Sequence, residues 1–482
     1  MSIFRKKSLS SLLSQLSESG EGTLKRTLDA KNLIALGIGA IIGAGLFVRT
    51  AAAAGEAAGP GVTLSFILAA LGCAFAGLCY AEFAAMIPIA GSAYTYAYCT
   101  MGEFVAWTIG WALVLEYALG AATVSIAWSE YLNNLLGGTI PFEWCHSPLE
   151  VSATGVHGIL NFPALVILLL LTMLLIKGTE ESATVNAIIV FTKVAIVLLF
   201  IAVGWQFINP ANHTPYLIPE GTVGHEDFFK HGWGGVVRGA SIVFFAFIGF
   251  DAVSTAAQEA KNPGRDMPIG ILGSLVVCTV LYILFGHVLT GVANWSEFKI
   301  AGKEASVAYA IQKYMTGYGW LATMVTVAIL AGFSSVILVM LLGQSRVFYS
   351  MAKDGLLPKV FAELHPKFRT PYKSNWILFV FVGLFSAFLP GSLAGDLTSI
   401  GTLFAFVLVS AGVWIMRRSD PDAKRPFRTP LVPMVPLLGV LICSGLIISV
   451  DRTTQLTAGA WMLVGFVIYF LYSKANSKLA SE

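Results

Sequence analysis

Apolar segments of about 20 residues recur along the whole chain and restrict what it can fold into. A helix needs about 20 mostly apolar residues to cross a bilayer, and only helices and closed barrels pair every backbone polar group inside lipid. Charged residues make up 12% of the 482-residue chain, whereas a soluble protein carries roughly 25%. The sequence therefore predicts an all-α polytopic membrane protein.

Twelve segments are predicted to form transmembrane helices. They are 32–54, 62–87, 103–132, 162–176, 185–207, 236–258, 269–293, 320–350, 376–389, 397–416, 432–450 and 458–471. With the N-terminus inside, 22 of the 30 lysines and arginines fall on the inner side, and positive charge concentrates on that side of membrane proteins. Both termini are therefore predicted to be cytoplasmic. The polar first 31 residues include SLSSLLSQLS (8–17), which forms either a surface helix or a disordered tail.

Two of these segments carry residues that weaken a helix near the middle of the bilayer. The first contains ALGIGAIIGAGLFV (35–48) and the sixth contains SIVFFAFIGFDAVS (241–254). At about 1.5 Å per residue, both weak points lie about 15 Å from a helix end. The two segments run in opposite directions, a pattern typical of inverted five-helix repeats with a binding site between broken helices. The predicted divisions are 1–31, 32–207, 208–416, 417–475 and 476–482.

Breaks at these points would expose backbone groups suited to an amino acid zwitterion. Amide N–H groups near Gly43, Ala44 and Gly45 could bind a carboxylate, helped by the helix dipole. Carbonyls of the sixth segment could bind an ammonium group; the candidates are Phe244, Phe245, Ala246 and Ile248. The alternative for the first segment is close helix packing through small residues, which we favour for Gly37 and Gly39.

Ionisable residues inside transmembrane segments are functional candidates. Lys193 lies about 12 Å from the inner end of the fifth segment and is either a proton carrier or a permanently charged structural contact to broken-helix carbonyls. Ser334 and Ser335, at a similar depth, offer a sodium site instead. Glu116 lies near mid-depth and faces either the pocket or a neighbouring helix. Glu82 and Asp251 are expected towards the inner side as gate or packing residues. Phe244, Phe245 and Phe247 are either core residues or, beside the second break, a cover over the substrate, and Phe244 is the candidate for the side-chain pocket or gate.

Three stretches resemble the amino acid–polyamine–organocation superfamily, most closely bacterial homologues of cationic amino acid transporters. They are LGIGAIIGAGLFV, FFAFIGFDAVSTAAQEAKNPGRDMPIGI and SRVFYSMAKDGLLPKVFAELHPKFRTPY. The resemblance implies the leucine-transporter-type fold of five plus five inverted helices with two added helices. It also implies alternating-access transport of L-amino acids in the bacterial cytoplasmic membrane.

The resemblance further implies roles for individual residues. Carboxylate contacts map to Ile41, Gly43, Ala44 and Gly45, and ammonium contacts to Phe245, Ala246 and Ile248. Lys193 corresponds to a lysine that replaces sodium in proton-coupled relatives, Glu116 to a glutamate that lines the pocket, and Phe333 to a position that sets the side-chain space.

The leading functional hypothesis is a proton-coupled symporter, and the alternatives are an exchanger, an uncoupled facilitator or an amino acid transceptor. The expected partners are an L-amino acid, a proton and membrane lipid, with a small accessory membrane subunit as a further possibility. No catalytic motif, metal-ligand spacing, phosphate loop or large basic run is present in the sequence, so no enzyme activity, metal, cofactor or nucleic acid is expected.

Overall fold

The computed structural model describes residues 5–7, 28–87, 92–152, 154–177, 183–255, 257, 260–299, 306–368 and 370–480. These residues are helical or irregular, and their β contacts are two isolated bridges, Leu28 with Ala260 and Val151 with His157. The tail segment 8–17 and Glu259 of the second family motif lie outside the described residues.

Each of the twelve predicted segments forms helix. The corresponding elements are α2 (Ala30–Ile41) with η1 (Gly45–Arg49), α3 (Thr50–Ala53) and η2 (Ala54–Ala58); α4 (Val62–Met86); α6 (Glu103–Val114) with η4 (Leu115–Leu119) and α7 (Gly120–Leu135); α8 (Phe162–Lys177); α9 (Ala183–Gly204); α10 (Gly232–Val243) with η9 (Phe244–Phe247) and α11 (Ala252–Thr255); α12 (Pro263–Val292); α14 (Gly319–Lys353); α15 (Tyr372–Phe388); α16 (Gly391–Ser419); α17 (Met434–Ile448); and α18 (Arg452–Ile468). Among the described residues, seven helical stretches are long and apolar enough to cross a membrane, and five shorter apolar helices accompany them.

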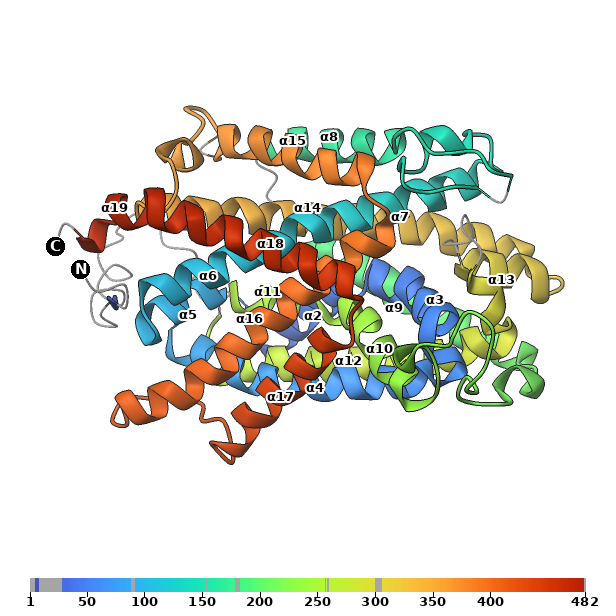
Figure 1. Cartoon of the computed structure of the whole chain (residues 1–482), viewed down its shortest axis with the longest axis horizontal. Helices are drawn as coiled ribbons and strands as arrows, with labels where there is room; N and C mark the ends of the chain where they lie inside the picture. Colours follow the sequence, from blue (N-terminus) through green and yellow to red (C-terminus); the bar gives the residue numbers. More distant parts are fainter. Residues whose placement is uncertain are drawn as a thin grey trace.

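The described residues nearest the two termini, 5–7 and 478–480, lie at the same end of the helix bundle, which we call the terminal end (Figure 1). The opposite end, which we call the loop end, carries the irregular segment 205–231 and the short helix α13 (Ser306–Tyr314). α8 and α15 lie together along one edge, while α4, α12, α2 and α10 pack in the body of the bundle. The first, second, sixth and seventh predicted helices therefore pack together in the core of the protein.

Both predicted helix breaks are present. α2 ends at Ile41, Ile42 is extended (φ −72°, ψ 107°), and the chain becomes helical again in the π-helical turn η1. The second break follows η9: Ile248 is extended (φ −60°, ψ 135°), and Gly249 has a φ of +109° that glycine adopts easily. The second break thus lies after Phe247: of the predicted carbonyls, that of Ile248 lies in the break, and those of Phe244, Phe245 and Ala246 lie in η9 just before it.

Three local features were not predicted. α5 (Ser92–Thr100) and α13 are helices outside the twelve segments, and the third segment contains the π-helical turn η4. π-Turns widen a helix locally and often occur at functional sites. Glu116 lies inside η4.

Candidate functional site

The two helix breaks touch each other. A Cβ added to Gly45 would lie 2.2 Å from the Cα of Ala246, and one added to Gly249 would lie 2.8 Å from the carbonyl oxygen of Ala40. The Tyr282 hydroxyl on α12 lies 3.0 Å from the Ile41 oxygen and 2.9 Å from the Ala246 oxygen, so it can donate to a carbonyl of either break. Two segments 200 residues apart therefore form one region of irregular backbone.

Backbone donors of the first break are available at this junction. The Gly43 oxygen accepts from the amides of Leu46 (3.2 Å) and Phe47 (3.5 Å). Outside the hydrogen bonds within helices, the N–H groups of Gly43, Ala44 and Gly45 donate no backbone hydrogen bond in the described part of the chain. Such N–H groups at the start of a helical segment suit an anion.

The carbonyls of the second break are more occupied. The Phe245 oxygen accepts from the Ile248 amide (3.3 Å), and the Ala246 oxygen faces the Tyr282 hydroxyl. Gly37, by contrast, packs as predicted, because a Cβ there would lie 2.4 Å from Ser274 Oγ of α12.

Lys193 joins the first break from α9. Its side chain is buried, and Nζ donates a 2.9 Å hydrogen bond to the Gly39 carbonyl. Its aliphatic part packs on α14, where a Cβ at Gly332 would lie 3.0 Å from Lys193 Cε. This contact is the one expected if Lys193 is a permanently charged structural residue that binds broken-helix carbonyls. The contact also places the Lys193 amine beside the predicted carboxylate site.

A narrow enclosed gap lies beside Lys193 and has no room for a water molecule. Its lining is apolar except for the lysine and includes Ile42, Phe47, Ile196 and Phe333. The Phe333 ring is fully buried and lies 6.3 Å from the ring of Phe47. Any side chain that enters this gap meets hydrocarbon and one ammonium group.

The other predicted residues lie close to this junction in different surroundings. Ser334 donates to the Leu330 carbonyl of its own helix (2.9 Å), and Ser335 is buried on the same helix. Phe244, a predicted pocket or gate residue, is fully buried and packs edge-on against Phe406 at a centroid distance of 5.5 Å.

Glu116 is completely buried and close to the second break. Its carboxylate lies near Thr402 of α16 and near Asp251, which directly follows the break. The neighbouring Tyr117 hydroxyl donates to Asp251 Oδ2 at 3.1 Å. Glu116 therefore faces the second break and α16, away from the gap beside Lys193.

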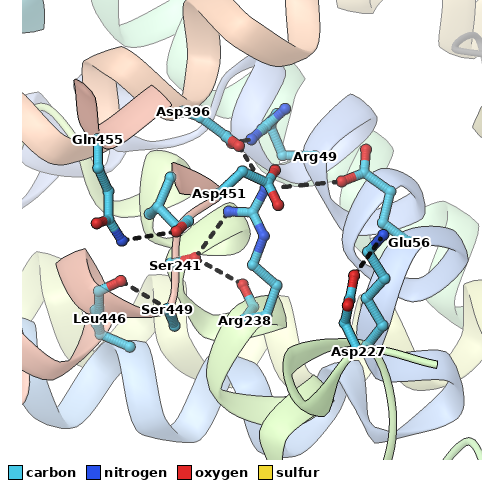
Figure 2. Close-up of polar contacts among 12 residues, drawn as sticks. Arg49, Glu56, Asp227, Arg238, Ser241, Asp396, Leu446, Ser449, Asp451 and Gln455 are labelled. Carbon is cyan, nitrogen blue, oxygen red and sulfur yellow. Dashed lines mark hydrogen bonds and ion pairs between the residues drawn. The ribbon is translucent and has the colours of Figure 1, made fainter. Parts of the chain in front are cut away.

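A buried ion-pair network, which sequence reasoning missed, lies towards the loop end (Figure 2). Arg49 and Arg238 both bind Asp396 of α16, and the second of these bonds measures 2.5 Å. Arg238 also binds Asp451 (2.9 Å), in the corner between α17 and α18. The sequence signal was a lone acid at the start of the tenth segment, with two arginines in the first and sixth.

The terminal end is closed by different contacts. Glu82 forms a bidentate pair with Arg417 (2.9 and 2.8 Å). This pairing is compatible with the predicted role of Glu82 as a polar gate or packing residue near this end. Asp354, at the end of α14, accepts from Lys7 Nζ (2.5 Å) and from the Tyr94 hydroxyl (2.7 Å). The junction of the breaks thus lies between two bonded ends.

Comparison with known proteins identifies the type of molecule. The sequence model of the amino acid permease family matches residues 28–472. The branched-chain amino acid permease BcaP of Bacillus subtilis is 44% identical over 99% of both chains, and the methylthioribose transporter of the same organism is 40% identical over 99% of both. The vacuolar cationic amino acid transporter 4 of Arabidopsis thaliana is 33% identical over 87% of this chain and 68% of its own. These relatives are named as transporters or permeases, not as enzymes, and the chain belongs to the amino acid permease family of the amino acid–polyamine–organocation superfamily.

Proposed function

We propose that this protein moves a neutral, apolar L-amino acid together with a proton across the bacterial cytoplasmic membrane by alternating access. The observation that carries the proposal is the contact between the two breaks. Gly45, at the start of η1, packs against the backbone of Ala246, so the N–H groups of Gly43, Ala44 and Gly45 and the carbonyls of η9 lie in one small region that offers donors for a carboxylate and acceptors for an ammonium group.

The proposed architecture is twelve transmembrane helices with the terminal end in the cytoplasm. Two inverted repeats, 32–207 and 208–416, would each contribute one broken helix, and 417–475 would add the last two helices. Helix formation in all twelve segments and a break in both the first and the sixth support this arrangement.

The lining of the gap favours an apolar substrate side chain. The Lys193 ammonium would repel a cationic side chain, and Ile42, Phe47 and Phe333 offer hydrocarbon instead. The relative at 44% identity is named as a branched-chain amino acid permease, so valine, leucine and isoleucine are the first substrates to test. The relative at 40% identity adds methylthioribose as a competitor to include.

Lys193 is the proposed proton carrier. The Gly39 carbonyl holds its Nζ at the first break, where a change in protonation would alter the backbone that binds the substrate carboxylate. If the site used sodium instead, Ser334 and Ser335 would supply hydroxyl ligands and Lys193 would occupy the space of the ion.

Purified protein in liposomes tests both the substrate and the coupling. Wild-type protein should accumulate leucine when the outside is more acidic, and Lys193→Ala should lose accumulation while keeping exchange of labelled for unlabelled leucine. Lys177→Ala, at the end of α8, is the matched control and should behave as wild type.

Three outcomes would change the proposal. Accumulation that ignores the pH gradient would leave an exchanger or facilitator, and accumulation that follows a sodium gradient would favour the serine site. Strong competition by arginine or by methylthioribose, with none by valine or isoleucine, would overturn the substrate class. Binding of leucine without any movement across the membrane would leave a transceptor.

A further inference from the structure

A cavity of about 980 Å³ lies at the loop end, beside the buried ion pairs. It is formed by the segment before α10, by the end of the first helix, and by the corner between α17 and α18. Its charged side chains are balanced, with three acids and three bases: Glu56, Asp227, Asp451, Lys230, Arg238 and Arg452. Phe228, Ile448 and Leu456 add exposed apolar surface to its wall. We call this cavity the loop-end chamber.

Arg238 has one deep partner and one replaceable partner. Asp396 is 6% exposed and binds the guanidinium from the buried side. Asp451 binds the same nitrogen from the chamber, and its side chain is 60% exposed. A half-exposed ion pair contributes little free energy, so an incoming carboxylate can compete for the position of Asp451.

Asp451 also has a second place to bind. It is the N-cap residue of α18, yet its side chain makes no capping hydrogen bond while it is held by Arg238. Aspartate at this position ordinarily accepts from the free N–H groups of the first helical turn. If Asp451 left Arg238, capping of α18 would offset part of the lost ion pair.

Glu56 lies where the other charge of a zwitterion would be. Its Oε2 is 4.0 Å from the Arg238 Nη2, and its side chain is 45% exposed to the chamber (Figure 2). In an amino acid the carboxylate and the ammonium group are attached to one carbon, so their protein partners must be close neighbours. Arg238 and Glu56 meet that condition.

We infer that the loop-end chamber is a first docking site for zwitterionic amino acids with apolar side chains. The ligand carboxylate replaces Asp451 on Arg238, its ammonium group binds Glu56, and its side chain lies against the apolar wall. Release of Asp451 frees the α17–α18 corner from the network that joins Arg49, Arg238 and Asp396. This inference rests on the proposed function and assigns the ligand of a second site on the same path.

Two substitutions should shift leucine uptake in opposite directions. Asp451→Asn removes the competing charge but keeps a good N-cap, so the concentration for half-maximal uptake from the loop-end side should fall about threefold. Glu56→Gln removes the partner of the ligand ammonium group, so the concentration for half-maximal uptake should rise about threefold. Glu220→Gln, an exposed loop residue outside the chamber, is the control and should change nothing.

The direction of these shifts separates docking from a purely structural role. If the network only holds the loop end shut, both substitutions loosen it and shift uptake the same way, which would overturn the inference. Unchanged uptake in both variants would also overturn it. Uptake from the terminal-end side should keep its half-maximal concentration in both variants, and a matching shift there would count against a loop-end site.

The proposed function is judged separately, by leucine uptake of the wild-type protein. If the wild type transports no amino acid, the chamber can still be tested by the rise in melting temperature that leucine causes in the purified full-length protein. Glu56→Gln should need about threefold more leucine for the same rise. The same dose dependence in both proteins would overturn the docking site.

Discussion

The two helix breaks lie against each other, but glycine is needed at each for a different reason. Gly45 has an ordinary backbone conformation, and its size matters because the second break passes directly over its Cα. Gly249 has a positive φ and also lies close to the Ala40 carbonyl, so both conformation and size matter there.

Their polar groups differ as well. Outside the hydrogen bonds within helices, the N–H groups of Gly43, Ala44 and Gly45 at the first break donate no backbone bond among the described residues, whereas the carbonyls of Phe245 and Ala246 at the second break already have donors nearby. The first break therefore suits immediate binding of an anion. The second must exchange an internal donor for the substrate, which makes it the better candidate for the part that moves.

The largest expected effect comes from filling the contact at Gly45. In Gly45→Ala the new methyl group would fall 2.2 Å from the Ala246 backbone, and the two breaks would have to separate. Such overpacking costs about 3 kcal/mol, so we expect loss of transport and a clearly lower melting temperature in detergent. Gly459→Ala, where no atom lies within 4 Å, is the control. Normal transport by Gly45→Ala would show that the breaks need not touch.

A somewhat smaller effect is expected at Gly249. Gly249→Ala forces a side chain into a backbone conformation that costs about 2 kcal/mol. The backbone strain acts at the second break, and the new methyl group also comes within 2.8 Å of the Ala40 carbonyl, so leucine binding should weaken more than stability falls. Thermal unfolding and leucine binding measured on the same preparation check this. If Gly45→Ala and Gly249→Ala lost equal stability and both still bound leucine, glycine would be needed at the two breaks for the same reason, which would contradict the comparison.

The sequence predicted the breaks better than their surroundings. Glycine clusters and the aromatic run weaken a helix locally, and this local chemistry placed both breaks within a few residues. Tyr282 was missed because its partners, Ile41 and Ala246, come from distant segments and its own helix shows no local signal. The orientation of Glu116 also depends on a π-turn and on the approach of α16, neither of which residue spacing reveals.

Tyr282 provides the next test, because its hydroxyl lies within hydrogen-bond distance of a carbonyl from each break. Tyr282→Phe removes the donor that serves carbonyls of both breaks and should cost about 1 kcal/mol. We expect slower transport with folding retained. Tyr131→Phe is the matched control, because its hydroxyl donates to the Phe47 carbonyl of the first helix (3.2 Å). If the control slows transport as much, the link between the breaks is not what Tyr282 contributes.

The smallest effect should come from Gly43, which tests what the first break uses for binding. A Cβ at Gly43 would lie 3.0 Å from Val336 Cγ2, a close contact that a small shift of one side chain relieves at a cost below about 1 kcal/mol. Gly43→Ala keeps the amide N–H, so a site built from backbone donors should retain leucine uptake within about threefold. If open space at Gly43 is what matters, uptake should fall further and recover in the double variant with Val336→Ala. Retained uptake would leave the N–H groups, and not the small size of this glycine, as the feature that distinguishes the first break from the second.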